Sequence, residues 1–147
     1  MSQSDYYGQD DQRNQILRAI SEVQDRIIEL ERRSADPQDP INPVEFGSAF
    51  HALGALSLKA GHYDQSFESF SRVLRLARAH GKNNWAGAAH GNLGAVCQAS
   101  GQHDSACHHF AEEARLARQC GDLVWEARAR AKLGTVTRLA AAADASA

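Results

Sequence analysis

Residues 53–85 read LGALSLKAGHYDQSFESFSRVLRLARAHGKNNW, and residues 93–125 read LGAVCQASGQHDSACHHFAEEARLARQCGDLVW. The two stretches share a Leu-Gly pair, a later glycine, an aspartate, a phenylalanine, a Leu-Ala-Arg string and a final tryptophan. Every shared position recurs after forty residues, and the Leu-Gly pair returns once more at Leu133-Gly134. A fixed period of this length is typical of proteins built from stacked structural repeats.

Each repeat is predicted to form two antiparallel helices. The first helix runs from about Pro43 to Ala60 and ends where Gly61 can adopt the left-handed backbone conformation. The second runs from about 65 to 80, with Asp64 as its N-cap. A copy of this pair follows at about 85–120, and a last helix at about 123–141 has no partner. The sequence therefore predicts an all-α fold: a short α-solenoid of antiparallel helical hairpins over residues 44–141, with an alanine-rich tail at 142–147.

Three glycines recur inside the first helices of the repeats, at Gly54, Gly94 and Gly134. A glycine inside a helix costs about 1 kcal/mol relative to alanine. Its recurrence at a fixed period predicts that a neighbouring helix packs closely at all three positions. Phe70 and Phe110 are expected to fill the space between paired helices.

The second repeat carries a spaced set of small, acidic and aromatic residues: Asn92, Leu93, Gly94, Gly101, Asp104, Ala106 and Phe110. This pattern resembles the tetratricopeptide repeat (TPR), and its forty-residue period resembles the longer variety found in LGN/Pins adaptors and kinesin light chains. The resemblance implies a scaffold for protein–protein interaction and a cytoplasmic setting associated with the cytoskeleton. The chain departs from the family pattern at Ser66, Val73 and Glu113, where a small residue is usual.

The same resemblance implies which side chains line a concave groove and bind a partner there. The expected binding residues are polar and lie on the first helices of the repeats: His51, Lys59, Asn92, Gln98, Arg128, Lys132 and Arg138. An asparagine at 92 has both a donor and an acceptor with which to hold an extended peptide backbone. The cations of the last helix favour an acidic ligand. The alternative is that these cations only keep a terminal helix in solution.

Residues 11–34 are predicted to form a separate amphipathic helix, between a flexible N-terminus at 1–10 and a proline-containing linker at 35–43. Its apolar side chains form a heptad-like seam of the coiled-coil kind: Ile16, Ile20, Val23, Ile27 and Leu30. Two interpretations remain open. The helix folds back onto its own repeats, or it pairs with a second copy or a foreign helix.

These patterns support two hypotheses of function. The first is an adaptor that binds a peptide or helix in the groove. The second is a structural subunit of a larger complex, cytoskeletal in the resemblance drawn above, which is held through the N-terminal helix and the outer helix faces.

Several other classes of function are disfavoured. The net charge of −2 gives no basic surface for nucleic acid. No run reaches the roughly 18–20 apolar residues that cross a membrane. Three cysteines make an odd set, which predicts a reducing compartment, the cytoplasm.

Histidines and a cysteine gather at residues 103–109, yet no second pair of ligands stands at a zinc-site spacing, so neither a metal nor a cofactor is expected. Because the phosphate-loop and H-E-x-x-H motifs are also missing, the prediction is a non-enzymatic protein without catalytic residues.

Overall fold

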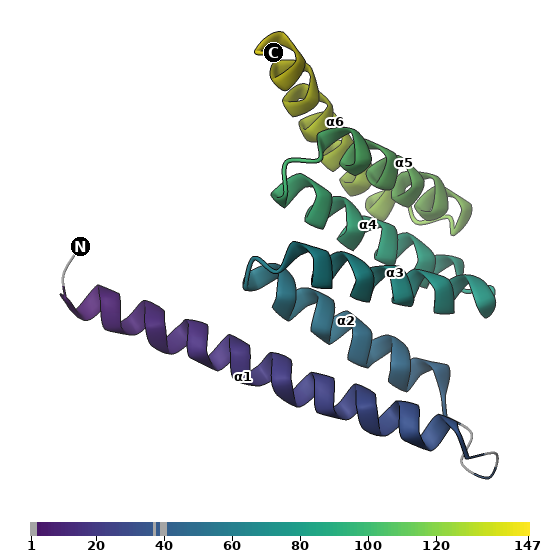
Figure 1. The fold of residues 1–147 in the computed structure, drawn as a ribbon. Coiled ribbons are helices and arrows are strands. Elements are labelled where there is room, and N and C mark those ends of the chain that lie inside the picture. Colours follow the sequence, from purple (N-terminus) through teal and green to yellow (C-terminus); the bar gives the residue numbers. More distant parts are fainter. Residues whose placement is uncertain (1–2, 37, 39–40) are drawn as a thin grey trace. The chain divides into compact units, whose positions relative to one another are not determined.

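The computed structural model of the protein describes residues 3–36, 38 and 41–147. These residues form six α-helices and no strand (Figure 1). The helices are α1 (Gln3–Ser34), α2 (Pro43–Lys59), α3 (Tyr63–Ala79), α4 (Asn83–Ala99), α5 (His103–Gln119) and α6 (Leu123–Ala145). They belong to two compact units that divide between Ser69 and Phe70, inside α3. The all-α prediction is thus confirmed for the described residues.

Glycines end four consecutive helices, α2 to α5, at intervals of twenty residues. Gly61, Gly81, Gly101 and Gly121 all have positive φ, between 62° and 78°. At the first of these turns, the His62 N–H donates to the Ser57 carbonyl at 2.8 Å and the Gly61 N–H to the Leu58 carbonyl at 3.1 Å. This pair of bonds satisfies carbonyls that the helix end would otherwise leave open, so the predicted glycine stops are confirmed.

The predicted N-cap of the second helix was wrong. α3 begins at Tyr63, so Asp64 lies within its first turn. A carboxylate in that turn still interacts favourably with the positive end of the helix dipole. Side-chain caps occur at α2, where Asn42 accepts from Val44, and at α6, where the Asp122 carboxylate accepts from the Trp125 N–H at 2.9 Å.

The first and last helices are longer than the sequence indicated. α1 begins at Gln3, whereas the apolar seam suggested a start near residue 11. Residues 3–15 contain no proline to interrupt a helix, and α1 continues through them beyond the seam. α6 extends to Ala145 through most of the predicted tail, because alanine has the highest helix propensity.

In the first unit, α1 lies along α2 (Figure 1). The seam residues Ile20, Ile27 and Leu30 are buried, while Ile16 and Val23 are half-buried. An ion pair of 3.5 Å between Arg33 and Glu45 also joins the two helices. In this unit the seam of α1 therefore faces α2, the chain's own second helix.

Ser66, a departure from the family pattern, has a structural role. Its buried hydroxyl donates to the Gly54 carbonyl at 2.7 Å and so joins α3 to α2. The Ser57 hydroxyl donates to Gln65 across the same helix pair at 2.7 Å. Both hydroxyls are satisfied within the unit, as buried polar groups usually are.

In the second unit, α5 packs against both α4 and α6. The core centres on Phe110, which is packed with Cys97, Ala106 and Val136. A Cβ atom at Gly94 would lie only 2.6 Å from the Phe110 ring, so the predicted close approach at this glycine is confirmed. The same prediction for Gly134 was wrong. The nearest atom to a Cβ there is Nη1 of Arg138, at 3.8 Å.

Candidate functional site

One face of α4 remains accessible in an otherwise buried helix. The accessible or half-accessible positions beyond its first turn are Ala88, Asn92, Ala95, Gln98 and Ala99. Four of them recur at intervals of four, three and four residues, so they share one side of the helix. We call Ala88, Asn92, Ala95 and Ala99 the α4 stripe. Gly91, the neighbour of Asn92 in the sequence, is buried, and a Cβ atom built there would meet Glu113 of α5.

α6 carries the equivalent positions forty residues later: Arg128, Lys132, Thr135 and Leu139, which we call the α6 stripe. Arg128, Thr135 and Leu139 are exposed, and Lys132 is half-buried. Where α4 has alanine and an amide, α6 therefore has two cations and a hydroxyl. Arg138 is exposed as well, and its guanidinium donates to the Thr135 hydroxyl at 3.4 Å.

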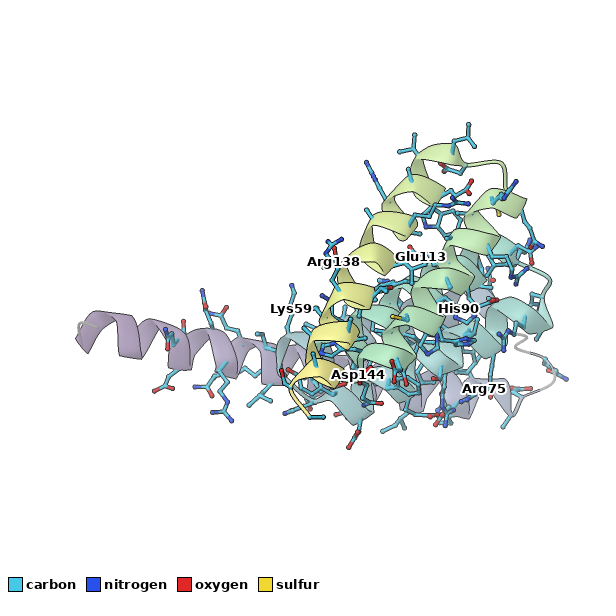
Figure 2. All side chains as sticks on the ribbon, turned by 90° about the horizontal axis from the view of Figure 1, so that it is seen from above. Lys59, Arg75, His90, Glu113, Arg138 and Asp144 are labelled. Carbon is cyan, nitrogen blue, oxygen red and sulfur yellow. The ribbon has the colours of Figure 1, made fainter. Side chains whose placement is uncertain are left out.

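Lys132 is held by a buried carboxylate on α5. Glu113 is only 4% exposed, and its Oε1 accepts from Trp125 Nε1 at 2.9 Å and from Lys132 Nζ at 2.8 Å. The ammonium also lies 5.0 Å from the centre of the Phe110 ring. Gly91 makes room for this carboxylate, because a Cβ atom there would lie 2.7 Å from Glu113 Oε1. Figure 2 shows Glu113 inside the packed helices and Arg138 at the surface.

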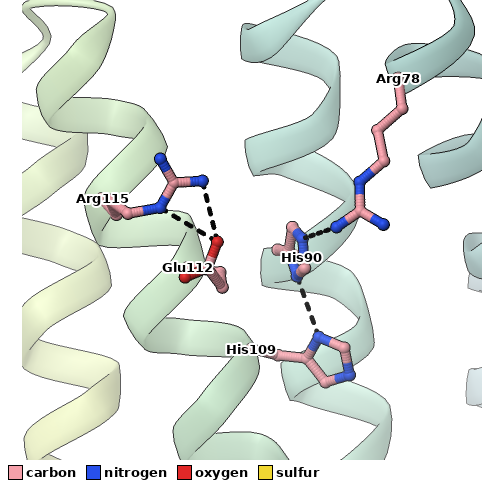
Figure 3. Close-up of polar contacts among 5 residues, drawn as sticks. All are labelled: Arg78, His90, His109, Glu112 and Arg115. Atoms are coloured by element: carbon pink, nitrogen blue, oxygen red, sulfur yellow. Dashed lines mark hydrogen bonds and ion pairs between the residues drawn. The ribbon is translucent and has the colours of Figure 1, made fainter.

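Two histidines form a second polar network in this unit (Figure 3). Arg78 Nη2 on α3 lies 3.3 Å from Nε2 of the buried His90 on α4. A guanidinium can only donate, so His90 Nε2 accepts and its proton resides on Nδ1. That Nδ1–H then donates to Nδ1 of His109 on α5, at 3.0 Å. The network is complete only while both imidazoles are neutral.

The surroundings oppose the charged form of both rings. Burial, then the neighbouring His109 and Arg78, lower the pKa of His90 from 6.5 to about 4. Burial, then His108 and Arg78, lower the pKa of His109. Glu112, a nearby carboxylate, bonds instead to Arg115 at 2.9 Å, and this bond keeps the pKa of Glu112 below its ordinary value.

The first unit has a cavity of about 260 Å³ between α1 and the end of α2. Its lining consists of Gln9, Gln12, Arg13, Ile16, Leu17, Lys59, Ala60 and His62. Three of these residues are basic, none is acidic, and three are aliphatic. Lys59, one of the predicted binding residues, therefore contributes to a cavity with α1.

The predicted binding residues are divided between the two units. Asn92, Gln98, Arg128, Lys132 and Arg138 all lie in the second unit, on α4 and α6. His51 and Lys59 lie on α2, in the first unit, and both are exposed. The sequence predicted candidate residues on each helix, but it did not indicate which of their cations pair with carboxylates of the chain itself.

Sequence reasoning missed the Glu113–Lys132 pair and the His90–His109 network. Both follow breaks in the repeat: Glu113 stands where the first repeat has Val73, and His90 where it has Phe50. The histidine-rich start of α5 has a different outcome. Cys107 Sγ lies 3.7 Å from the Thr137 hydroxyl, and no three potential ligands come together for a metal anywhere in the described ranges.

Comparison with known proteins adds one match. The family model described as Tetratricopeptide repeat matches residues 45–119, slightly more than half of the chain. Among curated proteins, none matches the chain significantly. No helix in the described part of the chain is both long and apolar enough to cross a membrane.

Proposed function

Because the chain belongs to the tetratricopeptide-repeat family, we propose that it is a non-enzymatic adaptor that binds an acidic peptide or helix along the α4 and α6 stripes. Repeats of this family generally mediate protein–protein interactions, and stacked helical repeats offer their first helices as a binding surface. α4 and α6 are the corresponding helices of the second and third repeats. The proposed compartment is the cytoplasm, which suits three free cysteines.

The observation that carries the proposal is the contrast between the two stripes. In the α4 stripe the side chains beside Asn92 are small, because Ala88 and Ala95 flank its amide. The α6 stripe adds positive charge at Arg128, and the Lys132 ammonium, which Glu113 already neutralises, remains partly accessible as a donor. An extended acidic segment could bond its backbone to Asn92 while its carboxylates approach Arg128 and accept from Lys132. Glu113 fixes the position of Lys132 beforehand, which reduces the entropy lost on binding.

The test is affinity purification from the native cell type with an Asn92→Ala, Arg128→Ala variant. Lys132 is left unchanged, because its removal would leave the buried Glu113 carboxylate without its cation. Arg118→Ala is the matched control: this exposed cation lies on α5, away from both stripes. We expect the double variant to lose the main co-purifying partner and the control to keep it. Retention by both variants, with circular dichroism unchanged, would refute binding along the stripes.

A structural-subunit role is the second candidate. The observation that favours it is Ile28, an aliphatic side chain on α1 that is 62% exposed while the seam faces α2. A helix-to-helix attachment through this outer side of α1 would bury it. The corresponding test is affinity purification with Ile28→Glu. If α1 is the attachment surface, this variant should lose a partner that wild type retains; an unchanged partner would contradict the structural-subunit role.

A further inference from the structure

The outer face of α6 is apolar and uncovered. Leu123 is 74% exposed and Val124 is 64% exposed. Ala127, Ala131 and Gly134 follow on the same side of the helix, at intervals of three or four residues. These five residues are the α6 outer face. A helix side that faces water normally carries charged residues, and a contiguous apolar surface usually marks an interaction site.

The same positions of α4 are covered by side chains of α5 and α6. Forty residues earlier, the counterparts of Ala127, Ala131 and Gly134 are Gly87, Gly91 and Gly94. A Cβ atom at Gly87 would overlap Trp125, and Cβ atoms at Gly91 and Gly94 would lie 2.7 Å from Glu113 and 2.6 Å from Phe110, respectively. Two of these three covering side chains belong to α5. At Gly134 the corresponding space is open, with only Arg138 Nη1 within 4 Å. α6 therefore presents to solvent the surface on which α4 receives a helix.

We propose that the α6 outer face docks an acidic amphipathic helix of a partner protein, with an aromatic side chain seated on Gly134. This surface is separate from the stripes of the proposed function. The second unit already contains a comparable arrangement. Phe110 covers Gly94, and the Lys132 ammonium lies 5.0 Å from the centre of its ring. Arg138 beside Gly134 can offer the same contact between a cation and an aromatic ring.

Charge selects the occupant. Between Ala127 and Ala143 the helix has four cations and no carboxylate. Arg130 is neutralised by Glu126 at 2.7 Å and Lys132 by Glu113, whereas Arg138 has no ion pair within the described part of the chain. A second copy packed face to face would bring like charges together. A helix with carboxylates at its edges would neutralise Arg138 instead.

Shape restricts the occupant further. Ala127 and Ala131 fill space that glycines leave free on α4, so a residue as large as Glu113 would not fit opposite Ala131. The docked helix needs small side chains there and the aromatic side chain one turn away. A suitable probe is a fluorescein-labelled peptide of residues 103–119 with Glu113→Ala, Arg115→Glu and Arg118→Glu, which keeps Phe110 and carries carboxylates at both substituted arginine positions besides Asp104 and Glu112. Its control is the same peptide with Phe110→Ala.

Binding of these peptides to the full chain is measured by fluorescence anisotropy. We expect saturable binding of the probe and at least about tenfold weaker binding of the control peptide, since buried aromatic anchors dominate such interfaces. Gly134→Leu should weaken probe binding by at least about tenfold, because the leucine side chain fills the space above residue 134 that the probe's aromatic ring would occupy. It should leave the fold intact, since only the end of a flexible arginine lies nearby. Arg138→Glu should weaken probe binding, whereas Arg118→Ala should not.

Two further results distinguish binding at the α6 outer face from binding along the stripes and from self-association. The Asn92→Ala, Arg128→Ala variant should bind the probe like wild type, so a failure of the stripes and a failure of the outer face can be told apart. Absence of saturable binding, or equal binding by Gly134→Leu with an unchanged circular dichroism spectrum, overturns the proposal. So does a wild-type dimer in sedimentation that Gly134→Leu converts to monomer, because a second copy then occupies the face.

Discussion

Lys132 illustrates how one cation can belong to both the fold and the binding surface. Its side chain is 42% exposed, while the side chain of its partner Glu113 is 5% exposed. Removal of the ammonium leaves a carboxylate in the protein interior with Trp125 as its remaining donor. Breaking a fully buried ion pair costs about 3–5 kcal/mol. Solvent reaches Lys132, so the cost here should be smaller.

We predict that Lys132→Met lowers the free energy of unfolding by about 2 kcal/mol, measured by urea denaturation at neutral pH. Adding Glu113→Gln should restore much of the loss, because the neutral amide oxygen still accepts from Trp125. Arg118→Met serves as the control and should change stability little. Equal stability of Lys132→Met and wild type would show that Glu113 does not depend on this cation.

His90 makes stability depend on pH. Its pKa falls from 6.5 to about 4 on folding, so between these values the unfolded chain binds more protons than the folded one. Stability is therefore complete above about pH 6.5 and is lost as the pH falls toward 4. The shift corresponds to roughly 3 kcal/mol. His109, whose pKa is also lowered, acts in the same direction.

The measurement is urea denaturation at several values between pH 7 and pH 4.5. We expect the wild type to lose stability steadily over this range, and His90→Gln to lose less, because its amide cannot take up a proton. His80→Gln, a change of an exposed histidine in the turn after α3, should follow the wild-type curve. Parallel curves for wild type and His90→Gln would contradict the assignment.

At the scale of the element, α4 and α6 share a sequence pattern and differ in what covers it. We predict opposite effects for alanine at equivalent glycines. Gly94→Ala should destabilise the protein, because the new Cβ atom would lie 2.6 Å from a ring in the core. Gly134→Ala should stabilise it by about 0.5–1 kcal/mol, because alanine has the higher helix propensity and space is open. Thermal denaturation of both variants checks the pair, and destabilisation by Gly134→Ala would mean that a neighbour covers this face in solution.

The elements themselves were largely predictable, and the contacts among equivalent elements were not. Gly61 and its repeats marked the helix ends because only glycine adopts their positive φ without strain. Gly94 and Gly134 look identical in the sequence, yet only one of them receives an aromatic ring. The period indicates which residues are equivalent, whereas burial depends on whether another helix packs against them. The same limit applied to Lys132, whose engagement depends on a glutamate at a position where the first repeat has valine.

At the scale of the whole molecule, net charge affects the rate at which a partner associates. Its net charge is −2, and residues 1–40 alone carry a net charge of −4. An acidic partner is therefore not attracted at long range, and it meets Arg128 and Lys132 only at close approach. Electrostatic steering, which raises association rates where the overall charges are complementary, should be absent. Attraction in the bound complex remains and is sensitive to salt.

We predict that added salt changes dissociation of the stripe-bound partner more than association. Raising the ionic strength from about 0.1 M to about 1 M shortens the screening length from about 10 Å to about 3 Å. Weakened contacts at Arg128 should then raise the dissociation rate several-fold, while the association rate changes by less than about twofold. Surface plasmon resonance with the purified partner and the full chain measures both rates. Arg128→Ala should abolish most of the salt effect on dissociation, and Arg118→Ala should preserve it. A steep fall of the association rate with salt would instead locate the recognition on another charged surface, such as the basic cavity between α1 and α2.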